Sequence, residues 1–201
     1  MEPTMVIATT SISSIIVEAL LKRAFIFMLQ ARRTDMALVA LRGKTELCKR
    51  LYSLVYSNFQ CVDVDGETMS SLSEATRESL RGLELAGATA QRDRLFNLYA
   101  KAYVNALKRN FKNVQFLFVT SSYFIARFVC NVNVERIRAA VPSKIFGEQL
   151  MLEMDQEQKT EFESRKMEAV RTTKNSRLIV FDSWEMLLYE VIREYDLSPR
   201  L

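Results

Sequence analysis

The stretch Val114-Gln-Phe-Leu-Phe-Val-Thr-Ser-Ser122 decides the fold class. It is rich in β-branched and aromatic residues and has no helical period, which is typical of a strand buried on both faces. Two further runs, Gln149 to Asp155 and Arg177 to Asp182, have the same character. Strands of this kind belong to parallel sheets whose two faces are covered by helices. The three runs therefore predict an α/β fold.

Helical patterns separate these runs. Residues 45 to 58 and 91 to 112 each place apolar side chains on one face and charged side chains on another. Thr45 is expected to be the N-cap of the first helix. The spacings Ser71-x-x-Glu74 and Asp182-x-x-Glu185 are those of capping boxes, so a helix is expected to begin at each. Strands alternating with helices predict right-handed βαβ units around a mainly parallel sheet.

Short apolar runs continue the alternation elsewhere. Residues 5 to 10 and 24 to 29 are predicted strands with a helix over 11 to 23 between them, and residues 59 to 63 form another short run. Periodicity does not separate runs this short from turns of a buried helix. An all-α helical domain is therefore the alternative architecture.

The composition fits one domain over residues 1–201. The chain has 201 residues, of which 49% are hydrophobic, enough for one sizeable core. The net charge of +4 permits a polyanionic partner but does not demand one. The apolar stretches Met5 to Val17 and Val114 to Val134 are interrupted by polar side chains, so neither predicts a signal peptide or a membrane span. No membrane partner is expected.

The absence of histidine removes whole classes of chemistry. Ser-His-Asp and Cys-His arrangements and histidine-based metal sites are excluded, because the sequence contains no His. Cys48, Cys61 and Cys130 are odd in number and far apart, which argues against a disulfide scaffold and against a zinc site. A reducing intracellular location, cytoplasm or nucleus, is expected. No cofactor and no metal are predicted.

The stretch LVALRGKTELCKRL, Leu38 to Leu51, raises the question of a phosphate loop. Gly43, Lys44 and Thr45 follow an apolar run and precede a helical pattern, as the end of such a loop does. The full pattern G-x-x-x-x-G-K-[ST] needs a first glycine at the position of Leu38, where a bulky side chain blocks the wrap of backbone around a phosphate. Gly43 as a turn with Thr45 as N-cap is the preferred interpretation. Lys44 and Thr45 as nucleotide-binding residues are the alternative.

The segment Asp63 to Glu74 has oxygen-bearing side chains at the spacing of a calcium loop. Its sixth position is Thr68, where the sharp turn of that loop needs glycine, and the sequence has no second loop. A hydrated acidic turn is therefore favoured over a calcium site.

Basic side chains recur along the helix expected over residues 91 to 112. They are Arg94, Lys101, Lys108 and Lys112. This stripe is a candidate surface for nucleic acid or a protein partner. The neighbouring Tyr99 and Tyr103 fall on the apolar face and are more simply explained as core.

An acidic stretch, Glu148 to Glu163, precedes a basic one, Arg165 to Arg177. The pair predicts a solvated helix with ion pairs such as Glu161 with Arg165, each worth about 0.3 to 0.5 kcal/mol. A partner-binding surface is the alternative.

Five segments, taken in order, share a pattern with a known family. They are MVIATTSISSIIVEALLKR (5–23), RDRLFNLYAKAYVNALKRN (92–110), VQFLFVTSSYFIARFV (114–129), VPSKIFGEQLMLEMDQEQ (141–158) and FESRKMEAVRTTKNSRLIVFDSWEMLLYEVI (162–192). Their order resembles a thymidylate kinase, a member of the nucleoside-monophosphate kinase family. The first resembles the strand, phosphate loop and helix that open such a kinase, and the second resembles the long helix lining its nucleotide site. The resemblance implies a P-loop kinase-like fold.

The chain departs from this family where the chemistry takes place. The segment in the place of the phosphate loop, Ala8 to Ser14, has neither glycine nor lysine, and Thr120-Ser121 replaces the Asp-Arg pair. The arginine-bearing lid between Asp155 and Phe162 is missing. Phosphoryl transfer depends on positioning and charge neutralisation, so a kinase without these groups is expected to be inactive.

The expected function is therefore that of a non-catalytic scaffold. It would bind a protein partner, or form a homo-oligomer, as part of a larger assembly such as a viral one. A nucleotide-binding kinase with an atypical phosphate loop is one alternative, and a basic nucleic-acid-binding module is another.

Overall fold

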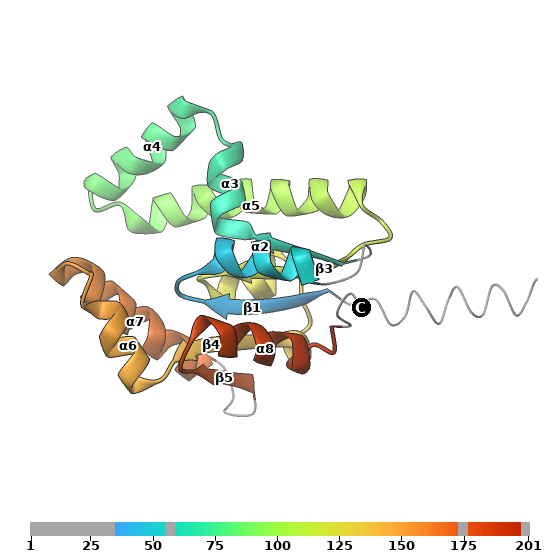
Figure 1. Ribbon diagram of the computed structural model, residues 1–201. Helices are drawn as coiled ribbons and strands as arrows, with labels where there is room; N and C mark the ends of the chain where they lie inside the picture. Colours follow the sequence, from blue (N-terminus) through green and yellow to red (C-terminus); the bar gives the residue numbers. More distant parts are fainter. Residues whose placement is uncertain (1–34, 55–58, 173–176, 198–201) are drawn as a thin grey trace, which may run out of the picture. The chain divides into compact units, whose positions relative to one another are not determined.

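The computed structural model describes residues 35–54, 59–172 and 177–197, which form an α/β fold (Figure 1). Five parallel strands make one sheet in the order β2-β3-β1-β4-β5. The strands are β1 (Met36–Ala40), β2 (Phe59–Asp63), β3 (Gln115–Thr120), β4 (Ile137–Pro142) and β5 (Leu178–Phe181). The prediction of an α/β fold with a parallel sheet is confirmed, and the all-α alternative is wrong.

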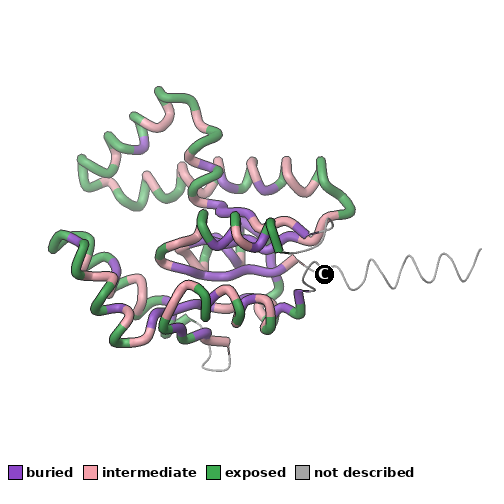
Figure 2. The backbone as a smooth tube through the Cα atoms, viewed as in Figure 1, coloured by how far each residue is buried: buried purple, intermediate pink, exposed green. Residues whose placement is uncertain are grey.

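Helices cover both faces of the sheet, and the buried residues concentrate on the strands between them (Figure 2). One face packs against α2 (Lys44–Leu54) and α8 (Trp184–Glu194). The other packs against α5 (Thr89–Asn110), the π-helical turn η1 (Ile125–Val129) and α7 (Gln156–Thr172). The remaining elements are α3 (Val64–Ser71), α4 (Glu74–Leu85), the 3-10 turn η2 (Val134–Arg136) and α6 (Lys144–Met151).

Strand β1 lies at the centre of the sheet. Its side chains alternate between the two cores, with Leu38 on the α2 and α8 side and Val39 on the α5 side. β1 pairs with β3 on one side and with β4 on the other. After β1 the chain forms β2 and β3 on one side of β1, and it then crosses over to form β4 and β5 on the other side. The direction of winding therefore switches at β1. In open parallel sheets, ligands bind outside the carboxyl ends of the strands at such a switch point.

The long periodic elements were predicted correctly. The run Val114 to Ser122 contains β3, the run Arg177 to Asp182 contains β5, and the helix expected over 91 to 112 is α5. The solvated helix is α7, which carries the predicted ion pair between Glu161 and Arg165.

The predicted strand Gln149 to Asp155 is wrong. Residues 149–151 form the last turn of α6, and residues 152–155 follow it. α6 starts after Ser143, whose hydroxyl accepts a hydrogen bond from the backbone N–H of Phe146 at 3.3 Å. Gly147 is buried against Pro142, so α6 packs at the end of β4. β4 itself was not predicted. An apolar run of this length fits a buried helix as well as a strand.

Two helices begin at a different residue from the one predicted. α4 is capped by Ser73, not Ser71, and α8 is capped by Ser183, not Asp182. In both, the serine hydroxyl accepts a hydrogen bond from the backbone N–H three residues later. The candidates at both sites, Ser71 and Ser73, and Asp182 and Ser183, are all short and polar, so the sequence does not tell them apart.

The predictions for residues 5–10, 11–23 and 24–29 and for Ala8 to Ser14 lie outside the described residues. A single domain over residues 1–201 stays a prediction for the same reason. None of the described helices is long and apolar enough to cross a membrane.

Candidate functional site

The carboxyl ends of β1, β2 and β3 surround a cavity of about 540 Å³. Lys44 enters it from the first turn of α2, Asp65 from the first turn of α3, and Ser121 from the end of β3. α5 contributes Arg92 and Phe96, among others, and α7 contributes Arg165. The cavity lies where parallel sheets place their ligands, which makes it the candidate site.

Asp65 is held by three groups of the protein. Its Oδ1 accepts a hydrogen bond from Thr120 Oγ1 at 2.7 Å, and its Oδ2 accepts one from the backbone N–H of Ser121 at 2.7 Å. The same Oδ2 lies 3.4 Å from Lys44 Nζ. The side chains of Lys44 and Asp65 are only 16% and 20% exposed, so this is a part-buried ion pair. The ammonium of Lys44 is therefore already neutralised from within the chain.

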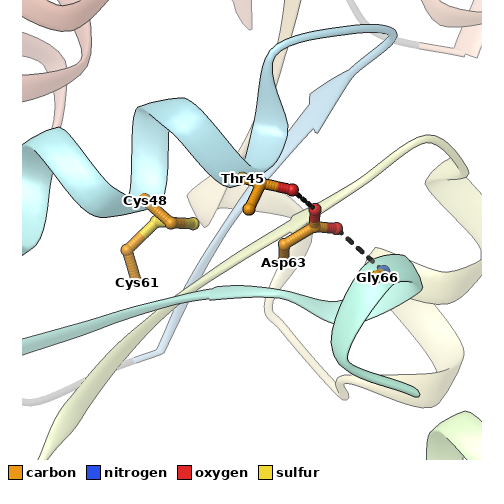
Figure 3. The surroundings of a disulfide bond; sticks show 5 residues. All are labelled: Thr45, Cys48, Cys61, Asp63 and Gly66. Atoms are coloured by element: carbon orange, nitrogen blue, oxygen red, sulfur yellow. Dashed lines mark hydrogen bonds between the residues drawn. A yellow bond between two sulfur atoms is a disulfide. The ribbon is translucent and has the colours of Figure 1, made fainter. Parts of the chain in front are cut away.

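Asp63 joins the beginnings of α2 and α3 (Figure 3). Its Oδ2 accepts a hydrogen bond from Thr45 Oγ1 at 2.6 Å, and its Oδ1 accepts one from the backbone N–H of Gly66 at 3.1 Å. Asp63 is buried and is the N-cap of α3. The prediction of a hydrated acidic turn is therefore wrong, because residues 64–71 are helical. Asp63 and Asp65, two of the four carboxylates that suggested a calcium loop, are occupied by contacts within the protein.

The loop between β1 and α2 has only three residues, Leu41 to Gly43. Leu38 lies inside β1 and is fully buried, so it is not part of this loop. Gly43 has a φ of +70°, and a Cβ atom there would lie 2.6 Å from the Trp184 ring. The prediction of Gly43 as a turn is confirmed. So short a loop with one glycine offers few backbone N–H groups to wrap around a phosphate chain.

Thr45 is not the N-cap of α2. The helix starts at Lys44, and the backbone N–H of Leu47 donates to the carbonyl of Gly43 at 2.8 Å. Thr45 therefore lies in the first turn, and its hydroxyl is free to donate to Asp63. The tertiary contact replaces the local cap that the sequence predicted.

A disulfide between Cys48 and Cys61 lies beside these contacts (Figure 3). It links α2 to β2 across a Cα–Cα distance of 4.9 Å. Cys48 follows Thr45 by about one helical turn, and Cys61 precedes Asp63 by two residues. The start of α2 and the end of β2 are thus tied by one covalent bond and one hydrogen bond. The sequence argument missed this bridge, since spacing along the chain does not show that α2 and β2 are adjacent.

Cys130 is a free and buried cysteine. Burial raises the pKa of its thiol to about 12, against a smaller lowering effect of the nearby Lys108 ammonium. Such a thiol is protonated and unreactive at neutral pH. With one cysteine pair bridged, the cysteines no longer argue for a reducing location, and the cytoplasm or nucleus stays a prediction.

None of the four basic side chains predicted over residues 91 to 112 lines the cavity. Arg94, Lys101 and Lys112 are exposed. Lys108 differs, because its Nζ lies 2.5 Å from Asp35 Oδ2 and donates to the carbonyl of Cys130 at 2.8 Å. Tyr103, which was expected in the core, does pack against the α5 side of the core. Of the predicted site residues, the structure brings only Lys44 to the cavity wall.

Sequence reasoning did not assign Asp65, Arg92 or Arg165 to this site, and it considered Asp65 only as part of a calcium loop. Asp65 follows a short apolar run, and a carboxylate just beyond a parallel strand was the signal that could have identified it. Arg165 was assigned only to the solvated helix. It pairs with Glu161 as predicted, yet it also lines the cavity.

All three cations lining the cavity have carboxylate partners within the chain. Lys44 pairs with Asp65, Arg165 with Glu161, and Arg92 with both Asp93 and Glu84, at 3.1 and 3.6 Å. Among the described residues, no cluster of His, Cys, Asp or Glu side chains is arranged to hold a metal ion. The described part of the chain therefore leaves no uncompensated positive charge on the cavity wall.

Comparison of the chain with family models, with curated proteins and with solved structures finds no match. The resemblance to thymidylate kinases therefore stays a prediction.

Proposed function

We propose that this chain is a non-catalytic α/β domain of the thymidylate kinase type, which acts by binding a protein partner. The observation that carries the proposal is the pairing of Lys44 with Asp65. An ammonium at the carboxyl end of β1 is the group that would neutralise a bound phosphate, and here a carboxylate of the same chain neutralises it. A phosphate would have to displace a part-buried carboxylate that also accepts two hydrogen bonds.

The other polar groups at this position support the same conclusion. The hydroxyl of Thr45, which would face a nucleotide-bound cation in an active site, donates to Asp63. The backbone N–H of Ser121 donates to Asp65 and is therefore already occupied. Phosphoryl transfer depends on such groups being free to face the reacting phosphates.

A surface between α2 and α8 supports binding of a protein partner. It contains a small hollow of about 170 Å³, lined mainly by Gly43, Leu47, Trp184 and Leu187. Met186 follows Glu185 and precedes Leu187 on α8. Its side chain is exposed and does not itself line the hollow. A hollow with apolar walls suits one apolar side chain of another protein, as interface anchors do.

Two experiments test the proposal. The purified chain, incubated with Mg-ATP and dTMP, is expected to form no diphosphate above a protein-free blank, and measurable turnover would contradict it. Affinity capture from the source cells should recover a partner that Met186→Glu loses. Val170→Glu is the matched control, because Val170 is similarly exposed but lies on α7. Equal capture by both variants would place the partner elsewhere and count against this surface.

A second candidate is nucleotide binding without turnover, using Lys44 and Thr45. One observation favours it: the volume of about 540 Å³ is in the range of small-molecule sites, and Phe96 offers an aromatic wall. It predicts a nucleotide-induced rise in melting temperature that Lys44→Gln abolishes and Arg42→Gln retains. Under the first proposal the wild-type chain shows no rise.

A further inference from the structure

Positive charge is concentrated in one segment of the chain. Residues 89–134 contain seven Lys and Arg side chains and a single Asp, a formal charge of +6, which leaves −2 for the rest of the chain. Arg92 and Lys108 are paired with carboxylates. Five cations of this segment have no carboxylate partner among the described residues: Arg94, Lys101, Arg109, Lys112 and Arg127.

Three of these cations lie along the boundary between α5 and η1: Arg94 and Lys101 on α5, and Arg127 on η1. On α5, Arg94, Asn97, Lys101 and Lys108 recur at intervals of three, four and seven residues, so they share one face of the helix. Asn97 lines the cavity together with Phe124 at one end of this boundary. Lys108 reaches the carbonyl of Cys130, just after η1, at the other end. The exposed Lys101 therefore lies between them, at the edge where α5 meets η1.

Two aromatic rings are exposed along the same edge. Phe124 and Phe128 are 50% and 61% exposed, although both are large apolar side chains. Their ring centroids are 5.1 Å apart, and the guanidinium of Arg127 lies 6.0 Å from the Phe128 ring. A hollow of about 550 Å³ adjoins them, lined by Arg127, Phe128, Asn131, Val132 and Asn133. Flat apolar faces, amides and unpaired cations thus share one surface.

We propose that this surface, formed by Arg94, Lys101, Phe124, Arg127 and Phe128, binds single-stranded nucleic acid. Exposed bases stack on Phe124 and Phe128, because every base has a π-face that an aromatic ring can cover. The cations neutralise the phosphates between successive bases. Duplex DNA fits less well, since its bases are already stacked on one another. An acidic protein segment would use the cations but not the two rings.

The test is fluorescence anisotropy with a labelled oligothymidylate of about 20 nucleotides. Binding should weaken as salt rises between about 50 and 200 mM, with a slope of log K against log salt near −2 for three neutralised phosphates. Phe124→Ala with Phe128→Ala should weaken binding by about tenfold or more. Arg94→Gln, Lys101→Gln and Arg127→Gln together should bring the slope close to zero.

Matched controls separate this surface from general effects. Tyr189→Ala removes an exposed aromatic ring on α8, and Lys49→Gln removes an exposed cation on α2. Both should bind like the wild-type chain, and circular dichroism verifies that every variant is folded. Three results would overturn the proposal: no binding at the lowest salt, equal affinity for a duplex of the same length, or unchanged affinity after removal of both phenylalanine rings.

Discussion

Replacing Gly43 by alanine should destabilise the protein by about 3 kcal/mol. The residue has a φ of +70°, a backbone region that costs alanine about 1 kcal/mol relative to glycine. The added Cβ would also lie 2.6 Å from Cζ3 and 2.8 Å from Cη2 of Trp184. A rigid ring cannot yield as the end of a flexible side chain does, and overpacking of this kind costs about 1 to 3 kcal/mol.

Gly87 provides a matched control for the backbone term. It has the same φ of +70°, but no atom lies within 4 Å of the position its Cβ would take. Gly87→Ala should therefore lose only about 1 kcal/mol, and the difference between the two variants isolates the contact with Trp184. Trp184→Leu introduced into the Gly43→Ala variant should cost less than it does in the wild-type chain.

Urea denaturation followed by far-ultraviolet circular dichroism measures all of these variants, because the signal does not depend on Trp184. Equal losses for Gly43→Ala and Gly87→Ala would refute the reasoning. Gly43 would then not be packed against α8, and the loop after β1 would be free to move towards a ligand.

Four further predictions concern stability and reactivity. The Cys48–Cys61 bridge spans 13 residues, so adding reductant should lower the free energy of unfolding by about 3 kcal/mol. The double variant Cys48→Ala with Cys61→Ala should lose the same amount, and reductant should not change its stability further. Tyr195→Phe should cost about 1 to 3 kcal/mol in urea denaturation, because the buried hydroxyl donates to the carbonyl of Ala37 at 2.6 Å; unchanged stability would mean that this hydrogen bond is absent. Cys130, with its pKa raised to about 12, should react with a thiol reagent at pH 8 only after unfolding. Since the thiol pKa is higher in the folded state, this group's contribution to stability is complete below about pH 9 and declines towards pH 12, a decline that should be missing in Cys130→Ala.

The sequence was most informative where the pattern was long or chemically uniform. β3 was evident because VQFLFVT combines β-branched and aromatic residues without a helical period, and α5 because its apolar stripe recurs over 22 residues. The same reasoning wrongly predicted a strand over Gln149 to Asp155. The apolar residues of this segment fit either structure, and the cap at Ser143 decided in favour of a helix.

The candidate site was harder to predict than the fold. Lys44 was identified as a candidate, and Gly43 as a turn, from local sequence alone. Asp65 was recognised only as part of a possible calcium loop, because its partner Lys44 is 21 residues away in sequence. The same applies to Cys48 with Cys61, and to Thr45 with Asp63. Each pair forms only once α2 and β2 are side by side, which no local pattern reveals.

The most direct test is equilibrium binding of Mg-ATP to the wild-type chain by titration calorimetry. If Asp65 and the other carboxylates pair with the cations of the cavity, no saturable binding is expected at nucleotide concentrations up to about 1 mM. A dissociation constant of about 1 mM corresponds to a binding free energy of about −4 kcal/mol. Saturable binding at micromolar affinity that Lys44→Gln abolishes would show that a phosphate displaces Asp65, and would contradict a site closed by the chain's own carboxylates.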